Sequence, residues 1–267
     1  MDLTISIIST NEKHYLDVLL PQIPLVAAGL KFEVILIDNA SNDGTSNLAK
    51  QFPFVQIIQN KDKKFFCANH NMAIERATSK YILLLNPDIS FDTSEPCLSR
   101  MYKFMEANPD CGIGGCRVYN YNNAFAYPAR RYQTLPMILG RRIPFLASKN
   151  TIDAYLYKKN DINSVFEADW LSGCFLFLRR KMFDQTGLLD TGFKKYFEDV
   201  DICRRAWATG WKVMYNGETF YYHLEQRASR NLFSKDAIKH LKSWMRWKSK
   251  QGEYRELEEA FKAGKSN

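Results

Sequence analysis

Asn86 and Asp88 flank Pro87 directly after an apolar run, a spacing that can place a carboxylate where a strand ends. Residues 81–85 are too few for a helix and predict a strand buried on both faces of a parallel sheet. Pro87 cannot continue a strand ladder, so the chain turns and displays Asp88 at the sheet edge where α/β proteins bind ligands. A carboxylate there can hold a hard divalent cation, and the cation a diphosphate. The alternative is that Asp88 only caps a following helix.

A second group of carboxylates, Glu198, Asp199 and Asp201, stands at the start of a predicted helix whose apolar residues recur at helical spacing. Acids in a first turn suit the helix dipole, and Asp201 can also pair with Arg205 one turn later. Glu198 and Asp199 follow two aromatic residues and are expected to lie partly desolvated at the helix mouth. Carboxylates in such surroundings can serve as general bases.

His223 ends a short aromatic run, residues 220–222. A single histidine in that setting can be a hydrogen-bonded core residue. It can also be a second ligand beside Asp88, because imidazole and carboxylate together suit Mn²⁺ or Mg²⁺ tolerably well.

The elements that must position these residues alternate between strands and helices. Strands are predicted at 3–10, 32–37, 55–59 and 81–86, with helices after residue 11 and at 69–77. The turn at 38–45 is rich in Asn, Asp and Ser, and Pro21 and Pro24 are expected to interrupt the first helix. Four strands alternating with helices within about 90 residues imply βαβ units and a parallel sheet of nucleotide-binding type.

The rest of the chain is predicted as further short elements around an irregular segment, 120–165, which suits a mobile or acceptor-facing role. The predicted elements are helix 97–108, strand 116–119 after a Gly-rich return, a strand ending at 178, helix 182–187, and strands 211–215 and 220–223. The tail from Glu253 is mixed in charge and is expected to fray.

Composition limits the function classes. The 267 residues suit one large domain or two halves that share a sheet, and the six cysteines form no C-x-x-C pair, so buried reduced thiols are expected. No leader-like start and no apolar stretch near the roughly 20 residues of a membrane span occur, so a cytoplasmic location is expected. The net charge of +8 favours an anionic partner. The sequence contains no nucleic-acid-binding motif, which excludes nucleic acid as that partner. It also lacks the glycine motifs of dehydrogenases and P-loop ATPases, which excludes both enzyme classes.

Residues 234–250 predict a helix with Ile238, Leu241 and Met245 on one stripe, and six Lys or Arg against one acid between 235 and 250. Basic amphipathic helices with Trp can lie on anionic lipid, which would give peripheral contact with a membrane face. The alternative is that the stripe packs on the domain while the lysines face water.

Together these stretches resemble glycosyltransferase family 2, the inverting nucleotide-sugar transferases of GT-A fold, and in particular its rhamnosyltransferase-like bacterial members. The matched stretches are 5–11, 34–45, 66–74, 85–88, 170–174, 198–205 and His223. The resemblance runs from residue 4 to about 230. It implies an α/β GT-A (Rossmann-like) fold, with a mostly parallel central sheet flanked by helices and a C-terminal helical extension.

The resemblance also implies roles at the matched positions. Asp38 would accept a hydrogen bond from a pyrimidine ring, and four further residues would line the nucleotide-sugar site: Thr10, Asn11, Asn71 and Asn86. Asp88, with His223, would hold a divalent metal, Mn²⁺ or Mg²⁺, that neutralises the diphosphate. Asp199, with Glu198 beside it, would deprotonate the acceptor hydroxyl, and Trp170 and Gly173 would contact the acceptor.

The implied organisation is a nucleotide-sugar-binding half (1–115), an acceptor-binding and catalytic half (116–233), and a basic C-terminal helix and tail (234–267). The implied reaction moves a sugar from dTDP-rhamnose or a UDP-sugar to a glycan or lipid-linked glycan acceptor. Three departures from the family pattern, at Phe65-Phe66, Ala73 and Asn86, can reshape the donor pocket and weaken metal ligation by residue 86. Two other classes stay open: a sugar nucleotidyltransferase, and a non-catalytic module that binds a nucleotide sugar or glycan.

Overall fold

A computed structural model of the chain describes residues 1–134, 137, 148–224 and 235–264. Within these ranges nine strands form one mixed sheet in the order β3-β2-β1-β4-β10-β6-β11-β5, with β8 paired to β11, and β7 pairs separately with β9. The strands are β1 (Leu3–Ser9), β2 (Phe32–Asp38), β3 (Val55–Gln59), β4 (Tyr81–Leu85), β5 (Ile89–Ser90), β6 (Cys111–Asn120), β7 (Ala129–Arg130), β8 (Val165–Glu167), β9 (Trp170–Leu171), β10 (Phe175–Arg179) and β11 (Lys212–His223).

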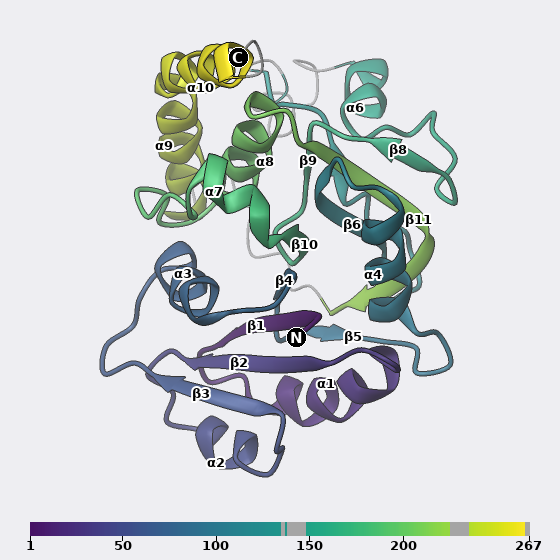
Figure 1. Cartoon of the computed structure of the whole chain (residues 1–267), viewed down its shortest axis with the longest axis vertical. Helices are drawn as coiled ribbons and strands as arrows, with labels where there is room; N and C mark the ends of the chain where they lie inside the picture. Colours follow the sequence, from purple (N-terminus) through teal and green to yellow (C-terminus); the bar gives the residue numbers. More distant parts are fainter. Residues whose placement is uncertain (135–136, 138–147, 225–234, 265–267) are drawn as a thin grey trace.

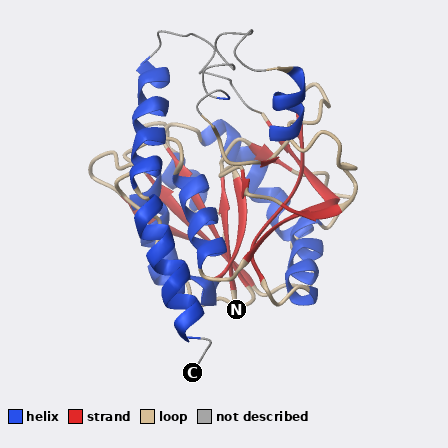
Figure 2. Ribbon diagram, turned by 90° about the horizontal axis from the view of Figure 1, so that it is seen from above, coloured by secondary structure: helices blue, strands red, loops and turns tan. Residues whose placement is uncertain are grey.

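Helices cover both faces of this sheet, as Figure 2 shows. They are α1 (Lys13–Val26), α2 (Thr45–Ala49), α3 (Phe66–Arg76), α4 (Cys97–Ala107), α6 (Lys149–Tyr155), the 3-10 turn η2 (Arg180–Met182), α7 (Phe183–Thr186), α8 (Glu198–Ala208), α9 (Lys235–Ser249) and α10 (Gln251–Gly264). One apolar core joins the sheet to α1 and α4, and a second joins its other face to α3, α8 and the C-terminal helices (Figure 1). The predicted α/β class and C-terminal helical extension are confirmed.

The central strand has the predicted character. All five residues of β4 are buried, and the strand lies between parallel β1 and antiparallel β10. Because β1, β2 and β4 are parallel, their carboxyl ends share one edge of the sheet. The turn at residues 86–88 therefore opens at the same edge as the ends of β1 and β2.

Three local predictions are wrong for identifiable reasons. Helix α1 continues through Pro21 and Pro24, because its apolar face, including Leu20 and Ile23, is fully buried against the core. The predicted strands 211–215 and 220–223 are one long strand, β11, with a register shift in its middle. The tail does not fray at Glu253 but forms α10, which buries Tyr254.

Glycines 112, 114 and 115 lie inside β6 and do not form a return before it, so the strand starts earlier than predicted. A Cβ at Gly112 would come within 2.7 Å of the Trp211 Cβ, and one at Gly114 within 2.9 Å of the Met105 Sδ. Close packing of Trp211, the residue before β11, and of α4 against β6 thus requires glycine there. The segment predicted as irregular, 120–165, holds β7 and α6 among its described residues.

The division into two halves and a C-terminal region stays a proposal. One sheet runs through both halves, and β6 spans residues 115 and 116. The C-terminal helix is present as α9, although its predicted first residue, Ser234, lies outside the described part of the chain. No helix in the described ranges is long and apolar enough to cross a membrane. All six cysteines are buried free thiols, as predicted.

Candidate active site

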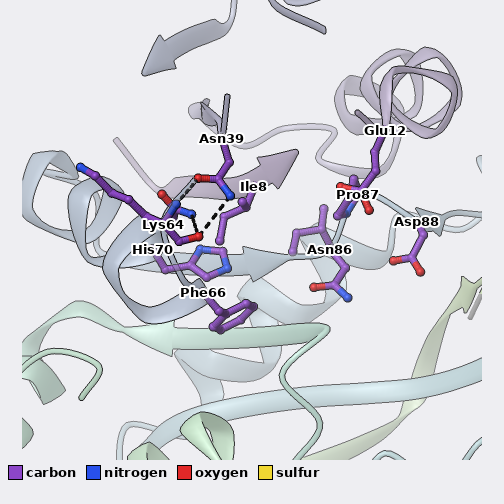
Figure 3. A pocket seen from close by; sticks show the side chains of 11 residues that line it. Ile8, Glu12, Asn39, Lys64, Phe66, His70, Asn86, Pro87 and Asp88 are labelled. Atoms are coloured by element: carbon purple, nitrogen blue, oxygen red, sulfur yellow. Dashed lines mark hydrogen bonds between the residues drawn. The ribbon is translucent and has the colours of Figure 1, made fainter. Parts of the chain in front are cut away.

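A cavity of about 250 Å³ opens at the carboxyl ends of β1, β2 and β4. Figure 3 shows side chains from these strand ends and from α3 converging on it. The lining residues are Ile8, Glu12, Asn39, Lys64, Phe66, Asn69, His70, Leu85, Asn86, Pro87 and Asp88. The cavity lies where the sequence placed a ligand site, and Asn86 and Asp88 both line it.

Asn39 organises one wall of the cavity. Its Oδ1 accepts hydrogen bonds from the Lys64 N–H (2.8 Å) and the Asn60 Nδ2 (3.0 Å). Its Nδ2 donates to the Thr10 Oγ1 and the Lys64 carbonyl, each at 3.1 Å. Every polar group of this nearly buried side chain is thereby used, which ties the ends of β1 and β2 to the loop before α3.

The predicted nucleotide residues Asp38 and Asn11 bond within neighbouring loops. Asp38 is 4% exposed, and its carboxylate accepts hydrogen bonds from the Ser41 N–H at 2.9 Å and from the Ser46 hydroxyl. Asn11 has a left-handed backbone (φ 60°), and its Oδ1 accepts from the Asn42 N–H at 2.8 Å. These contacts shape the loop beside the cavity, and the assigned contacts with a base stay predictions.

Three titratable residues of the cavity, Glu12, Lys64 and His70, were not predicted as site residues. His70 is buried, its Nδ1 lies 2.7 Å from the Ser6 Oγ, and burial lowers its pKa to about 3, so the ring is neutral. Burial also raises the pKa of Glu12, although a hydrogen bond from the Thr10 N–H opposes this shift. Asn39 could have been found from its position directly after a strand. His70 could not, because only the fold brings α3 against β1.

Asn71, predicted to bind the donor, points elsewhere. Its Nδ2 donates to the Leu189 carbonyl (2.8 Å), and its Oδ1 accepts from the Leu189 N–H (3.0 Å). The side chain does not line the cavity described above. It fastens α3 to the segment that leads into α8, so it links the two parts of the candidate site.

Helix α8 places the second group of carboxylates. The two residues before it, Tyr196 and Phe197, have left-handed backbones (φ 70° and 68°), a conformation that costs free energy in residues other than glycine. The Asp199 Oδ2 accepts a hydrogen bond from the Gly173 N–H at 3.0 Å, and its Oδ1 accepts from the Val200 N–H at 2.9 Å. The strained turn therefore places the Asp199 carboxylate at the start of α8, where two backbone N–H groups fix its orientation.

Glu198 and Asp199 have unusual protonation equilibria. Burial, and then the neighbouring charge of Asp199, raise the pKa of Glu198 to about 8. The Glu198 Oε2 is buried and has no hydrogen-bond partner within the described ranges. Burial also raises the pKa of Asp199, against the opposing effects of the Gly173 N–H and the charge of Arg130. A carboxylate with a raised pKa is a stronger base when ionised.

Asp201 takes the structural role expected for it. It is fully buried and pairs with Arg205 at 2.6 Å. Its Oδ1 forms an ion pair with the Lys250 Nζ at 2.8 Å and accepts a hydrogen bond from the Tyr254 hydroxyl at 2.6 Å. Both partners lie near the C-terminal end of the chain. Asp201 thus anchors α8 to α10.

The residues before β10 connect the two groups of carboxylates. Gly173 bonds to Asp199, and the carbonyl of the next residue, Cys174, accepts from the Asn86 N–H at 2.9 Å. A Cβ on Gly173 would lie 3.3 Å from the Asp199 Cβ, so the absence of a side chain permits this approach. A short backbone bridge therefore sets Asp199 beside the turn that carries Asp88.

His223 lies in contact with Asp88. Its Nε2 lies 3.1 Å from the Asp88 Oδ1, and the Asp88 carbonyl accepts from the Leu224 N–H at 2.9 Å. Burial lowers the pKa of His223, but Cys174 and Asp88 raise it more, to a net value of about 11. The end of β11 thus holds Asp88 through both its side chain and its backbone.

The described ranges contain no group of three or more His, Cys, Asp or Glu side chains able to hold a metal ion. Asp88 at the cavity wall nevertheless fits the way Mg²⁺ is commonly held, by one or two carboxylates together with substrate phosphates. Metal binding by His223 would require a neutral imidazole. The assignment of Asp88 and His223 as ligands stays a prediction.

Trp170, predicted to contact the acceptor, is 3% exposed. Its Nε1 donates to the Arg131 carbonyl at 2.8 Å, and the Arg130 guanidinium lies 4.9 Å from its ring centroid. Trp170 of β9 is thus paired with Arg130 of β7 and stacks on its guanidinium, whose charge lowers the pKa of Asp199. Its contact with an acceptor stays a prediction.

Comparison with known proteins places this geometry in a family. The family model described as "Glycosyl transferase family 2" matches residues 4–187. The rhamnosyltransferase WbbL of Escherichia coli K12 is 25% identical over 251 residues, which cover 91% of each chain. The N-acetylglucosaminyl-diphospho-decaprenol L-rhamnosyltransferase of Mycobacterium tuberculosis is 26% identical over 199 residues, covering 68% of this chain and 63% of that protein.

Solved structures share the fold at low sequence identity. The mannosyltransferase PcManGT from Pyrobaculum calidifontis, in complex with GDP-Man and Mn²⁺, is 14% identical with a TM-score of 0.58, over 85% of this chain and 58% of that one. Residues 1–349 of S. aureus TarS with UDP-GlcNAc are 13% identical with a TM-score of 0.60, over 86% of this chain and 60% of that one. The chain spans less than two thirds of each of these two structures. The predicted family is confirmed: the chain belongs to glycosyl transferase family 2 and is a glycosyltransferase.

Proposed function

We propose that this enzyme transfers a sugar, rhamnose in the first instance, from a pyrimidine-nucleotide diphosphate donor to a hydroxyl of a lipid-linked glycan, with inversion at the sugar carbon. The observation that carries the proposal is the short backbone bridge from Asp199 through Gly173 and Cys174 to Asn86, next to Asp88. Two rhamnosyltransferases among the relatives support the sugar, and the name of one supports a diphospholipid acceptor.

Asp199 is the proposed general base. Its carboxylate accepts the proton of the acceptor hydroxyl while the acceptor oxygen bonds to the sugar carbon and the bond to the diphosphate breaks. The hydrogen bond from Gly173 fixes its orientation, and its raised pKa increases its basicity once it is ionised. Glu198, with a pKa of about 8, is largely protonated at neutral pH and does not compete for that proton.

The donor is proposed to bind in the 250 Å³ cavity, with its diphosphate toward Asp88. Asp88 would hold a divalent cation there, with His223 beside it. When bound, the cation neutralises the charge that grows on the leaving diphosphate. Thr10 and Asn39 keep the rim of the cavity rigid through their mutual hydrogen bond.

The test is thermal unfolding in the presence of dTDP, UDP, GDP or ADP, each with and without Mn²⁺, for wild type, Asp88→Asn and Asp17→Asn. Asp17 is an exposed carboxylate on α1 and serves as the matched control. We expect a pyrimidine diphosphate to stabilise wild type and Asp17→Asn only when Mn²⁺ is present, and not to stabilise Asp88→Asn. A ligand present at 100 times its Kd raises the free energy of unfolding by about 2.7 kcal/mol, which thermal unfolding detects readily. Preference for a purine nucleotide, or equal stabilisation of the two variants, would contradict the proposal.

A further inference from the structure

Helix α9 presents an apolar stripe to solvent. Ile238, Leu241 and Met245 are 56%, 37% and 57% exposed, although each is a large hydrophobic residue. The opposite side of the helix is the buried one, with Trp247 at 3% and Lys250, just beyond its end, at 6%. The alternative in which the stripe packs on the domain is therefore wrong, because the opposite face of the helix packs on the domain.

Contacts of the inner face hold this orientation. The Ser243 hydroxyl donates to the Lys195 carbonyl at 2.8 Å, and the Trp247 ring lies 5.6 Å from the Tyr132 ring. The Phe197 ring lies 5.1 Å from His240 and 6.0 Å from Trp247. Because the inner face is fixed by these contacts, the stripe cannot turn inward without breaking them.

Cations border the stripe on both sides. At about 100° per residue, the three apolar side chains fall within an arc of about 60° on the helix surface. Lys248 lies at one border of that arc, and Lys242, then Lys239, lie at the other, all on exposed positions. Arg246, between Lys242 and Lys239 around the helix, is paired with Asp190 at 2.9 Å. The only acidic residue of α9 is Asp236, which pairs with Lys195 and Lys239. The outward face of α9 thus combines an apolar centre with positive flanks.

We infer that this face of α9 docks on an anionic lipid surface, with the three apolar side chains inserted at the headgroup level and the lysines among the lipid phosphates. Charge complementarity selects this partner, since positive flanks on both sides of an apolar stripe are the pattern of helices that lie in a membrane interface. A stable protein interface needs about 800 Å² from each partner, more than three side chains on one helix offer.

Docking there would bring the membrane to the acceptor side of the enzyme. Helix α9 packs on Phe197, the residue directly before Glu198 and Asp199. In Figure 1, α9 lies at the edge of the molecule beside α7 and α8 and away from β2 and β3. A lipid-linked hydroxyl held in the same membrane would then approach Asp199 from the surface. This consequence rests on the proposed function, whereas the docking itself does not.

The experiment is flotation of the full chain with vesicles of phosphatidylcholine alone or mixed with phosphatidylglycerol. Binding is expected only to the anionic vesicles and is expected to weaken with salt, since salt screens exposed charges. The triple variant Lys239→Glu/Lys242→Glu/Lys248→Glu is expected to lower partitioning of the protein onto anionic vesicles more than about 100-fold. Loss of each lysine costs about fivefold, and reversal of its charge costs more. Ile238→Ser/Leu241→Ser/Met245→Ser is expected to lower it at least about tenfold.

The matched control reverses three exposed lysines away from α9, as Lys31→Glu/Lys50→Glu/Lys103→Glu, and should float like wild type despite the same change in net charge. Stabilisation by nucleotide with Mn²⁺, measured on every variant, reports the donor site separately, so failure of docking and failure of the proposed function are distinguishable. Equal flotation of the control and the α9 charge variant would overturn the inference. The inference would also be overturned if the wild type bound no vesicles but formed a dimer that the serine variant does not form. The stripe would then be a protein interface.

Discussion

The proposed donor side and the proposed acceptor side of the site are held together in different ways. On the donor side, one wall of the cavity is a network of neutral amides and hydroxyls centred on Asn39 and Thr10. On the acceptor side, α8 is anchored by buried charges from distant parts of the chain. Lys250 reaches both Asp190 (2.7 Å) and Asp201 (2.8 Å).

The difference separates the forces that act on each side. Neutral hydrogen bonds each contribute modestly and depend little on pH or salt. Buried ion pairs are costly to break one partner at a time, and buried carboxylates without full pairing make stability depend on pH. The amide network around Asn39 should therefore be insensitive to changes of pH that strongly affect the buried carboxylates at α8, and the following predictions test that contrast.

The largest effect is expected from Asp199→Asn. The amide cannot take the acceptor proton, so kcat should fall by about 10²- to 10⁴-fold, the usual contribution of a general base. The donor cavity does not include residue 199, so the Kd for nucleotide should stay within about twofold of wild type. Steady-state transfer assays and nucleotide titration measure the two quantities.

Asp184→Asn, at an exposed carboxylate in the first turn of α7, is the control for this change and should leave both quantities unaltered. A parallel loss of nucleotide affinity in Asp199→Asn would show that the two sides are one energetic unit. An unchanged kcat would remove Asp199 as the base.

The next largest effect is expected from Lys250→Met. The substitution keeps the buried alkyl chain but removes the ammonium from between Asp190 and Asp201, so the free energy of unfolding should fall by about 3 kcal/mol. Urea unfolding measures this loss. Glu258→Gln, which breaks exposed pairs of α10 with Arg204 and Lys262, should cost no more than about 0.5 kcal/mol. Equal losses in the two variants would mean that α10 is not held by its buried charges.

This contrast also explains what could be predicted from the sequence. The strand 81–85 and the turn that displays Asp88 depend on neighbours in the chain, and the pattern of residue types was enough to place both at the cavity. The spacing of apolar residues placed Asp199 at a helix start, and α8 begins at residue 198. The link from Asp199 to Gly173 joins segments 26 residues apart, and no local pattern records it.

The acceptor side was predicted less well for the same reason. Helix α10 looked like a fraying tail because its stabilising contacts, Tyr254 and Lys250 with Asp201, are made with a helix about 50 residues earlier. The periodicity of α9 identified its stripe, but two faces of that helix could have packed inward. The choice depended on Trp247 meeting Tyr132 and Phe197, a contact that only the folded chain defines.

The most gradual expected effect is a change in the pH dependence of stability caused by Glu198→Gln. Glu198 has an ordinary pKa of 4.5 and a folded-state pKa of about 8, so between these values the folded protein holds a proton that the unfolded chain has lost. Folding therefore binds protons, and the contribution of Glu198 to stability falls as the pH rises from 4.5 to about 8, by up to about 1.4 kcal/mol per pH unit.

The glutamine side chain introduced by this substitution imitates the protonated form of Glu198 and cannot titrate. Glu198→Gln should therefore match wild type in acid and become progressively more stable than wild type up to about pH 8. Urea unfolding at a series of pH values gives the difference between the two curves, in which the similar contribution of Asp199 largely cancels. A variant of the donor side, Asn39→Ala, should instead lose a constant amount at every pH, because no titratable group is involved. Parallel wild-type and Glu198→Gln curves would mean that Glu198 is ionised in the folded protein and that a charged pair, rather than a single base, faces the acceptor.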